Sequence, residues 1–465
     1  MQNMMRKKQN LISKKVAIIN LGCKVNKYES DAMAEKLQSA GMVIVEPEEY
    51  ADVYIVNTCS VTNMAQKKSR QMLRRAKKNN PDAVIIAAGC YVNAEHDVLL
   101  AEDFVDVLVG NNRKNEIVQV VEDCLEQHEN NDYYLDINQT KEYEEMGCID
   151  VNVMDHQRAY IKIQDGCNQF CSYCIIPYTR GRVRSRKPEK IMNEIEKLAK
   201  EGIKEFVLTG IHISSYGVDF GGAETEYDQV FCDNERISDN QTNMDANRGC
   251  DRGCIENLGD LIYAIEQIPE VQRIRLGSLE PRIVTREFLD RIGKSEKLCP
   301  HFHLSLQSAC NDTLKRMNRK YTIEEFVDKC NLLREYFDRP AITTDVIVGF
   351  PGETEEEFAT TVANLSLLHL YELHVFKYSV RSGTVAEKLP NQVPEEVKNI
   401  RSNKLLELTE KQKVQFEQEL SGMEAEILVE ERIQEGVYTG HTKRYVKVDI
   451  PSDTDNVNQI VKVVL

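Results

Sequence analysis

The chain has 465 residues, of which 42% are hydrophobic, and that is enough for two or three domains with their own apolar cores. Its 14 cysteines are too sparse for the disulfide scaffold of a small secreted protein, no signal-peptide core follows the basic first residues, and no apolar run approaches the length of a membrane span. The formal net charge of −16 gives no reason to expect a nucleic-acid partner, so composition alone indicates a cytoplasmic protein with reduced thiols and no membrane partner.

Residues 15–145, which follow a short basic tail at residues 1–14, alternate apolar runs with amphipathic ones. The predicted strands are 16–21, 52–57 and 83–88. The predicted helices lie near 29–40, 63–79 and 113–125. Alternation of strands and helices is typical of a parallel sheet, so we expect this segment to form an α/β domain.

One cysteine lies just past each of these three predicted strands. The three are Cys23, Cys59 and Cys90. In open α/β sheets, sites form at the carboxyl ends of strands, so the three thiols can converge at one edge despite their separation in sequence. Two interpretations remain open: a three-thiolate metal cluster, or three unrelated cysteines at strand ends. The basic run at residues 67–78 is either a phosphate-binding surface or a solvated helix face.

The second segment, residues 146–385, begins with three closely spaced cysteines. They are Cys167, Cys171 and Cys174. Thiolates hold iron–sulfur clusters, and four irons with only three protein thiolates leave one iron open to a small-molecule ligand. The alternatives are a buried helical stripe or three of four zinc ligands. Gly166 and Pro177 disfavour a long helix, and no fourth Cys or His follows closely enough to close a compact zinc site.

Strand and helix signals continue to alternate through this segment. With the strand before Cys167 there are six predicted strands, the others being 205–210, 273–278, 301–306, 343–350 and 373–379. Six consecutive β/α units predict an open, partial barrel related to the eightfold barrel. Period-two alternation places His303, Ser305 and Gln307 on one face of their strand, which we expect to line the lumen. Such polar side chains either meet a polar ligand or bond only to one another.

Two features modify the barrel pattern. Residues 221–256 are acidic and lack a hydrophobic period, so they are expected to form a flexible surface insertion. After the strand at 343–350, Gly349 and Gly352 precede Thr354 and Glu357, which fit a capping box. The glycines suit either the close approach of a ligand to the backbone or a tight turn.

The chain ends with a predicted linker helix at residues 386–420 and a small β-domain at residues 421–465. Mixed aromatic and cationic residues in the β-domain suit RNA binding, and the alternative is a domain that only packs on its neighbour. The candidates for RNA contact in this domain are Lys443, Arg444 and Tyr445. The basic run at 180–187, just after the cluster loop, adds Arg180, Arg182, Arg184 and Arg186 as candidates for phosphate contact.

Together these motifs resemble the radical S-adenosylmethionine (SAM) methylthiotransferases over nearly the whole chain. The sequences LGCKVNKYES, NTCSVTNMA and AAGCYVNA resemble the amino-terminal cluster domain of that family, and GCNQFCSYCIIPYTRGRVRSR resembles its radical SAM loop. The carboxyl-terminal segment resembles its RNA-binding TRAM domain. The implied fold is an α/β amino-terminal domain, a partial (β/α)6 radical SAM barrel and a small all-β domain. Lys24 and Val25 resemble the branch that acts on threonylcarbamoyladenosine in tRNA.

The resemblance implies two 4Fe-4S clusters and SAM as cofactors. Cys167, Cys171 and Cys174 would hold the cluster that cleaves SAM to a radical, and Cys23, Cys59 and Cys90 would hold the cluster that donates sulfur. A second SAM would supply the methyl group, and the product would carry a methylthio group at carbon 2 of the adenine. The implied SAM contacts are Thr209, Gly210, Ser278, Glu280, Ser305, Gln307, Asp345, Gly349 and Gly352.

The implied partners are tRNA, an electron donor and a sulfur source, and the protein is expected to be a monomer. Within the enzyme class, the alternative substrate is isopentenyladenosine in tRNA. From a different class, the sequence also allows a non-catalytic, metal-containing RNA-binding protein, or a two-cluster electron carrier that would need neither a barrel nor an RNA-binding end domain.

Overall fold

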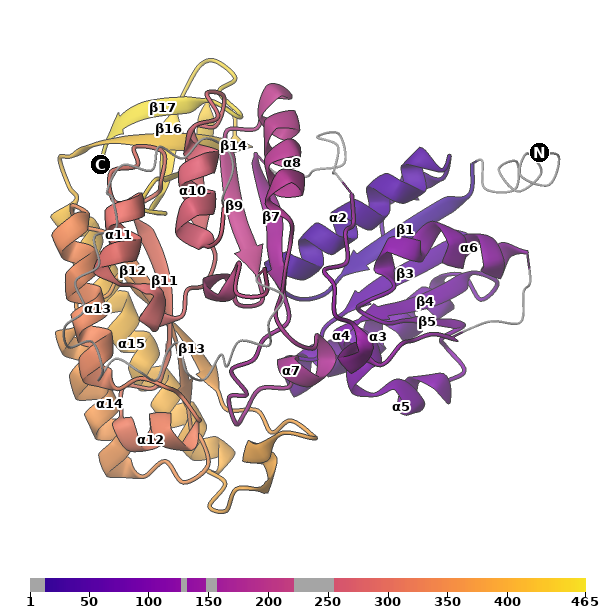
Figure 1. Ribbon diagram of the computed structural model, residues 1–465, viewed down its shortest axis with the longest axis horizontal. Helices are drawn as coiled ribbons and strands as arrows, with labels where there is room; N and C mark the ends of the chain where they lie inside the picture. Colours follow the sequence, from indigo (N-terminus) through magenta and orange to yellow (C-terminus); the bar gives the residue numbers. More distant parts are fainter. Residues whose placement is uncertain (1–12, 127–131, 148–156, 221–254) are drawn as a thin grey trace.

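The computed structural model describes residues 13–126, 132–147, 157–220 and 255–465 (Figure 1). The predicted basic tail and almost all of the predicted acidic insertion lie outside these residues. No helix in the described ranges is both long and apolar enough to cross a lipid bilayer.

The amino-terminal part contains a parallel sheet with the strand order β2-β1-β3-β4-β5-β6. Its strands are β1 (Lys15–Asn20), β2 (Val43–Val45), β3 (Val53–Thr58), β4 (Val84–Gly89), β5 (Val107–Val109) and β6 (Asp132–Tyr133). The three predicted strands correspond to β1, β3 and β4. The other three have only two or three residues each, which is too few for a periodic signal.

Helices cover both faces of this sheet, as its parallel strands require. The elements are α2 (Lys24–Ser39), α3 (Asn63–Asn79), α4 (Cys90–Ala94), α5 (His96–Leu100), η1 (Lys114–Glu116), α6 (Ile117–Leu125) and η2 (Ile137–Gln139). One core packs α2 and α6 against the sheet, and a second core packs α3, α4 and α5 against the opposite face. In Figure 1, α2 lies between this sheet and the central part of the molecule.

The central part is the predicted open barrel. Its parallel strands are β7 (Arg158–Asp165), β9 (Glu205–Gly210), β10 (Arg273–Leu276), β11 (His301–Gln307), β12 (Ala341–Val348) and β13 (Glu372–Lys377). A short antiparallel strand, β8 (Arg184–Ser185), extends the edge beside β7. Isolated parallel bridges join the β10 and β11 regions, so the two halves of the barrel are continuous.

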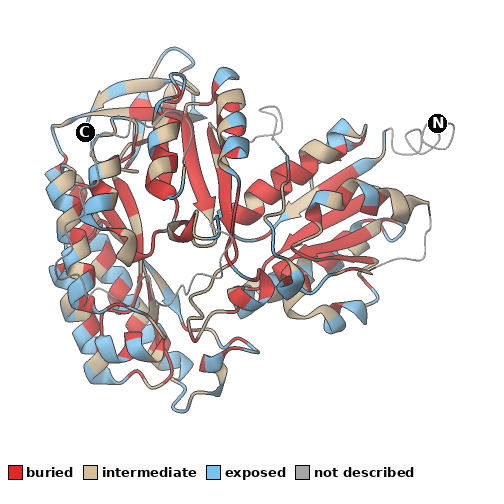
Figure 2. Cartoon of the chain, in the orientation of Figure 1, coloured by how far each residue is buried: buried red, intermediate tan, exposed pale blue. Residues whose placement is uncertain are grey.

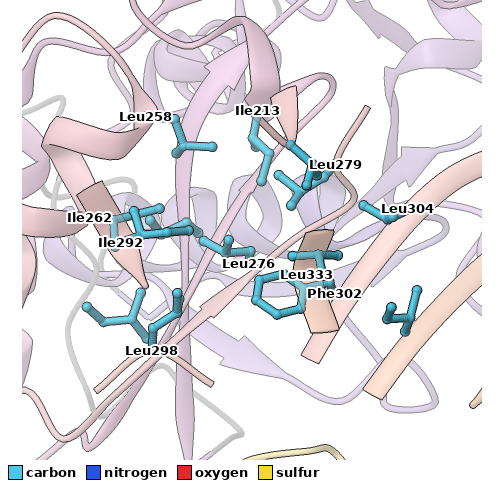
Figure 3. Close-up of a cluster of buried hydrophobic side chains, with 14 of the residues drawn as sticks. Ile213, Leu258, Ile262, Leu276, Leu279, Ile292, Leu298, Phe302, Leu304 and Leu333 are labelled. Carbon is cyan, nitrogen blue, oxygen red and sulfur yellow. The ribbon is translucent and has the colours of Figure 1, made fainter. Parts of the chain in front are cut away.

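The alternation predicted for the barrel strands is confirmed. Phe302, Leu304 and Leu306 belong to the apolar core between the strands and the outer helices, part of which Figure 3 shows. His303 and Ser305 lie on the opposite face and are only partly buried. The strands are mostly buried, while the surrounding helices expose their outer faces (Figure 2).

The helices of this part pack outside the strands, as in Figure 1. They are α7 (Ile176–Thr179), α8 (Pro188–Lys200), η4 (Ile213–Ser215), α10 (Leu258–Glu266), η5 (Pro281–Ile283), α11 (Arg286–Ile292), α12 (Asn311–Arg316), α13 (Ile323–Tyr336), α14 (Glu355–Leu367), η6 (Val385–Lys388) and α15 (Glu395–Glu419). The capping box of Thr354 and Glu357 at the start of α14 is present. The predicted linker helix is α15, which packs along β13.

The carboxyl-terminal part is an antiparallel sheet with the order β16-β15-β14-β17 and a small apolar core of its own. Its strands are β14 (Glu424–Gln434), β15 (Val437–Thr442), β16 (Lys447–Pro451) and β17 (Ile460–Val464). Arg158, at the start of β7, forms an ion pair with Glu430, and Arg273, at the start of β10, donates to the backbone oxygens of His441 (3.0 Å) and Glu426 (2.8 Å). The β-domain therefore covers the amino ends of the barrel strands.

Candidate active site

Cys23, Cys59 and Cys90 follow β1, β3 and β4 and lie together at the carboxyl edge of the amino-terminal sheet. Burial and the nearby Cys90 thiol raise the pKa of Cys59 to about 11, and Cys23 adds to this effect. Burial also raises the pKa of Cys23, with a further contribution from Cys90. Cys59 thus senses the other two thiols and Cys23 senses Cys90, and Gly22, next to Cys23, lies against the Cys59 side chain, so the three cysteines lie close together.

Two hydrogen-bond donors are directed at the sulfur of Cys90. Arg180 Nε lies 3.3 Å from this sulfur, and Asn111 Nδ2 lies 3.5 Å from it. Donors of this kind stabilise a thiolate and are typical of the surroundings of iron–sulfur ligands. The residues around this trio therefore fit a thiolate-bound cluster.

Cys167, Cys171 and Cys174 lie in the loop that follows β7. Burial, together with the charges of Cys171 and Cys167, raises the pKa of Cys174. Arg319 donates to the sulfur of Cys171 at 3.2 Å, and the backbone amide of Gln169 donates to that of Cys167 at 3.5 Å. This trio also has donors that suit thiolate ligands.

The loop depends on Gly166, which has a φ of 73° and lies against the backbone of Arg182. A Cβ atom at Gly166 would lie 1.8 Å from the Arg182 oxygen, so only glycine allows this turn. Among the described residues, no three His, Cys, Asp or Glu side chains surround a point suitable for a single metal ion, which is the arrangement that a zinc site needs.

A buried charge network connects the two trios. Glu29 of α2 accepts from Lys162 of β7 (2.7 Å) and Arg180 (2.8 Å), and it also pairs with Lys114. Asp165, which ends β7 just before the second trio, accepts from Lys162 at 2.6 Å and from Arg180 at 3.1 Å. With Arg184, which lies 3.9 Å from Asp165, four cations thus surround two carboxylates, and one of them, Arg180, also contacts Cys90.

Glu29→Gln is expected to lower the free energy of unfolding by about 3–5 kcal/mol, because it leaves buried cations with one carboxylate fewer. Burial alone raises the pKa of Glu29, but Arg180, Lys114 and Lys162 outweigh it and hold this pKa well below its ordinary value. The stabilisation is therefore complete above the unfolded-state pKa of about 4.3 and is lost as the pH falls through the lowered folded-state pKa.

Denaturant unfolding of the wild type and the variant at pH 7 and at pH 4 and below measures this effect, and the difference should shrink on acidification. The matched control is Glu35→Gln on the same helix, where the carboxylate accepts only from Ser39 in an exposed position. A change within about 0.5 kcal/mol is expected there. Equal losses in the two variants would contradict the role of the network.

Comparison with known proteins gives two family matches. The model described as "Radical SAM superfamily" matches residues 161–365, and the model described as "Uncharacterized protein family UPF0004" matches residues 15–110. A threonylcarbamoyladenosine tRNA methylthiotransferase of Bacillus subtilis is 37% identical over 96% of this chain and 93% of its own length. A tRNA-2-methylthio-N(6)-dimethylallyladenosine synthase of Natranaerobius thermophilus is 33% identical over 97% of this chain and 94% of its own.

The chain belongs to the radical SAM methylthiotransferase family.

Among solved structures, a radical SAM methyltransferase of Kitasatospora setae has a similar fold, with a TM-score of 0.54 at 14% identity over 78% of this chain and 73% of that one. As a member of its family, the methylthiotransferase uses SAM and two 4Fe-4S clusters. Its predicted fold class is confirmed, including the all-β carboxyl-terminal domain.

Two of the predicted SAM contacts of the methylthiotransferase are connected with the second trio, and a third has a strained backbone. Glu280 acts electrostatically on Cys167 and accepts from Arg282 Nε at 2.8 Å. The backbone oxygen of Ser305 accepts from Arg319, the residue that donates to Cys171. Gln307 has a φ of 72°, which is strained for a residue other than glycine. These positions suit contact with a ligand of the cluster loop.

The other predicted SAM contacts lie in different surroundings. Thr209 is buried, Ser278 is exposed, and Asp345 lies 3.2 Å from His303. Gly349 and Gly352 have φ values of 70° and 77°, so both serve the turn after β12.

At two of the predicted glycine contacts, Gly349 and Gly210, any side chain would collide with neighbouring protein atoms. A Cβ atom at Gly349 would lie 2.3 Å from Lys398 of α15, and one at Gly210 would lie 2.9 Å from the backbone of Gln164. A protein side chain thus fills the Cβ side of Gly349, which accounts for the glycine by a tight turn, and its contact with SAM stays a prediction.

Of the four arginines of the 180–187 run that were predicted to contact tRNA phosphates, three are not accessible in this structure. Arg180, Arg184 and Arg186 are buried, with at most 4% of their surface exposed. Arg186 pairs with Glu145 and Glu194, and Arg184 Nη2 donates to the backbone oxygen of Arg180 at 2.8 Å. These three side chains are buried because the run crosses between the amino-terminal sheet and the barrel. Their charges meet carboxylates of both parts of the protein there.

Arg182 is the exception in this run. Its side chain is exposed, and its guanidinium lies 4.4 Å from the centre of the Phe170 ring in the cluster loop. It remains a candidate for tRNA contact at the rim of the site.

The predicted RNA contacts of the β-domain face the barrel instead. Tyr445 stacks on His301 at a ring-centre distance of 5.0 Å and lies under the guanidinium of Arg275 at 4.7 Å. Lys443 donates to the backbone oxygen of Glu296, and Arg444 to that of Asp338. These three side chains make contacts between domains, which favours the alternative interpretation of this segment, and their contact with RNA stays a prediction.

Several residues of the site gave no usable signal in the sequence. Glu29, Lys162 and Asp165 are ordinary charged residues of a helix and a strand, and Arg319 lies 148 positions from Cys171. Only the alternation of β7 could have placed Lys162 toward the lumen, because Ile161 and Ile163 belong to the outer core.

Proposed function

We propose that this methylthiotransferase inserts a methylthio group at carbon 2 of threonylcarbamoyladenosine beside the anticodon of tRNA, in the cytoplasm. The observation that carries the choice of substrate is the identity of 37% over 96% of this chain to an enzyme named for that nucleoside. The pair Lys24 and Val25 after Cys23 supports the same branch. The second candidate substrate is the dimethylallyl nucleoside named for relatives that are 31–34% identical.

Cys167, Cys171 and Cys174 would hold the cluster that binds SAM, and Cys23, Cys59 and Cys90 would hold the cluster that supplies sulfur. When bound, the two clusters provide one-electron reduction of SAM and a sulfur atom for transfer. Arg319 donates a hydrogen bond to the sulfur of Cys171, and the amide of Gln169 donates one to the sulfur of Cys167. Arg180 and Asn111 donate hydrogen bonds to the sulfur of Cys90.

The protein also sets the position of one cluster site relative to the other. Arg180 contacts Cys90 and Asp165, and Asp165 Oδ1 accepts from the amide of Gly166, one residue before Cys167. A buried linkage of this kind, in which each carboxylate meets several cations, resists displacement, so sulfur donor and substrate base are held in reach of each other. The barrel wall around the lumen limits access of water and stray thiols.

The test is nucleoside analysis of tRNA from a strain that lacks this gene. Methylthio-threonylcarbamoyladenosine should disappear, and threonylcarbamoyladenosine should accumulate in its place, while the methylthio derivative of the dimethylallyl nucleoside stays unchanged. Persistence of the first product together with loss of the second would refute the proposed substrate and favour the second candidate. Restoring the gene should restore the original profile.

A further inference from the structure

The lumen of the barrel contains a group of basic side chains that the cluster sites do not use. Arg158, Arg275, His301, His303 and His374 extend from β7, β10, β11 and β13 on the faces opposite the outer core. The ring centres of His303 and His374 lie 5.3 Å apart. The middle of the lumen is therefore polar and rich in groups that attract an anion.

Lys24 joins this group from the other domain. It is the first residue of α2, directly after Cys23, and α2 lies against β7 and β9. The charges that act on its ammonium group are Arg275 of β10 and the first residues of β7 and β9, Arg158 and Glu205. Its own charge acts in turn on His301 and His374. Lys24 is also exposed to solvent, and these charges place its ammonium group near the basic residues of the lumen.

Three of the carboxylates in this region are already paired with cations, and a fourth, Glu372, lies two residues before His374 on β13 and acts on it electrostatically. Glu205 lies within 3.4 Å of Arg158, 3.7 Å of Arg273 and 2.9 Å of Arg275, so three guanidiniums share it. Glu430 pairs with Arg158, and Asp345 pairs with His303 at 3.2 Å.

Two basic groups are left over. Within the described part of the chain, neither the Lys24 ammonium nor the His374 ring has a hydrogen bond or ion pair. His374 is also exposed, as is Phe376 two positions along the same face of β13, with half of its surface accessible. The lumen therefore offers an uncompensated cation, an unpaired imidazole and a ring on which a base can stack.

We propose that Lys24 and His374 bind the carboxylate of the threonylcarbamoyl group when the substrate base enters the lumen. This inference rests on the proposed substrate. Threonine linked through its amine to the base keeps a free carboxylate, whereas a dimethylallyl group carries no charge. A lumen with unpaired basic groups therefore favours binding of the threonylcarbamoyl group. It disfavours the dimethylallyl group, since this apolar group would leave the basic groups desolvated without a partner.

The site lies between two domains, so it forms only when the amino-terminal sheet is docked on the barrel. Lys24 comes from the strand-end loop that also carries Cys23, and His374 comes from the last barrel strand. Binding of the carboxylate by Lys24 would thus orient the substrate base relative to Cys23, the first cysteine of the sulfur-donor trio. Lys24 acts here as a specificity-determining residue.

The test compares two anticodon stem-loop RNAs, one with threonylcarbamoyladenosine and one with its neutral carboxamide analogue. Dissociation constants are measured for the full-length wild type, Lys24→Met, His374→Gln and Lys27→Met. The wild type should bind the carboxylate RNA about 10- to 100-fold more tightly than the carboxamide RNA. In Lys24→Met this ratio should fall to near 1, and in His374→Gln it should fall by a smaller factor.

Lys27→Met is the matched control, because Lys27 lies one turn along α2 and pairs with Asp31 at 2.9 Å. It should keep the wild-type ratio. Each ratio is measured within one protein, so a loss of cluster or of general RNA affinity does not imitate the effect. A wild-type ratio near 1, or an unchanged ratio in Lys24→Met, would overturn the inference.

Failure of the inference can be distinguished from failure of the proposed function. If the wild type modifies the threonylcarbamoyl RNA but the ratio does not depend on Lys24, only the carboxylate site is wrong. If the wild type modifies an RNA with the dimethylallyl nucleoside and not the threonylcarbamoyl RNA, the proposed substrate is wrong and the inference falls with it.

Discussion

Cys171→Ala is expected to abolish SAM cleavage and methylthio product together. The variant removes one of only three thiols in the loop, so the cluster that they would hold loses an anchor that no neighbour replaces. Arg319, which donates to the Cys171 sulfur at 3.2 Å, would face a methyl group instead. Iron in anaerobically purified protein should fall from about eight to about four atoms per chain. Chromatography of 5′-deoxyadenosine and of the modified nucleoside measures both activities.

The matched control for this variant is Cys330→Ala, which removes a fully buried thiol of the same barrel, in α13 and away from the loop. It should keep its iron and both activities and lose only modest stability. Undiminished SAM cleavage by Cys171→Ala would show that this loop does not hold the catalytic cluster. The zinc-containing alternative would also be tested here, because it predicts zinc rather than iron in the wild type.

Cys59→Ala is expected to separate the two activities. SAM cleavage should continue, because Cys167, Cys171 and Cys174 are untouched, while formation of methylthio product should fall below detection. Cys59 senses the charges of Cys90 and Cys23 and so belongs to the trio at the edge of the amino-terminal sheet. Iron should again fall to about four atoms per chain. The readouts are 5′-deoxyadenosine, the modified nucleoside and iron from the same preparation.

Cys124→Ala serves as the control in the amino-terminal part, since Cys124 is a half-buried cysteine of α6 outside the trio. It should retain sulfur insertion and the full iron content. A normal yield of methylthio product from Cys59→Ala would refute the role of this trio as the sulfur donor, whatever its iron content.

The regular parts of the fold were accessible from the sequence because their signals are local. Buried strands such as Val53–Thr58 form continuous apolar runs, and strand 301–307 alternates in period two. The order of β and α segments then implies parallel strands, and parallel strands place loop cysteines at one edge. This is why Cys23, Cys59 and Cys90 could be grouped before any coordinates were known.

The arginine run at residues 180–187 shows that local sequence signals do not predict which charged side chains are buried. Arg182 and Arg184 are both basic and both adjacent to the cluster loop, but Arg182 is exposed and Arg184 is buried. Whether a charge is solvated or paired depends on which distant carboxylates the fold brings to it. For Arg180 that partner is Glu29, 151 positions away, and no periodicity within either segment encodes the pairing.

By itself, the sequence predicted the closely spaced cysteines of the loop after β7 and the order of the domains, because close thiolate spacing and hydrophobic period are properties of short segments, and the resemblance of whole motifs indicated the class of chemistry. Only the tertiary structure decided that the basic run joins two domains, that the β-domain uses Tyr445 to cover the barrel, and that Lys24 lies near the basic groups of the lumen. Those outcomes depend on burial and on charge pairing between distant segments, and both are set by how the domains pack.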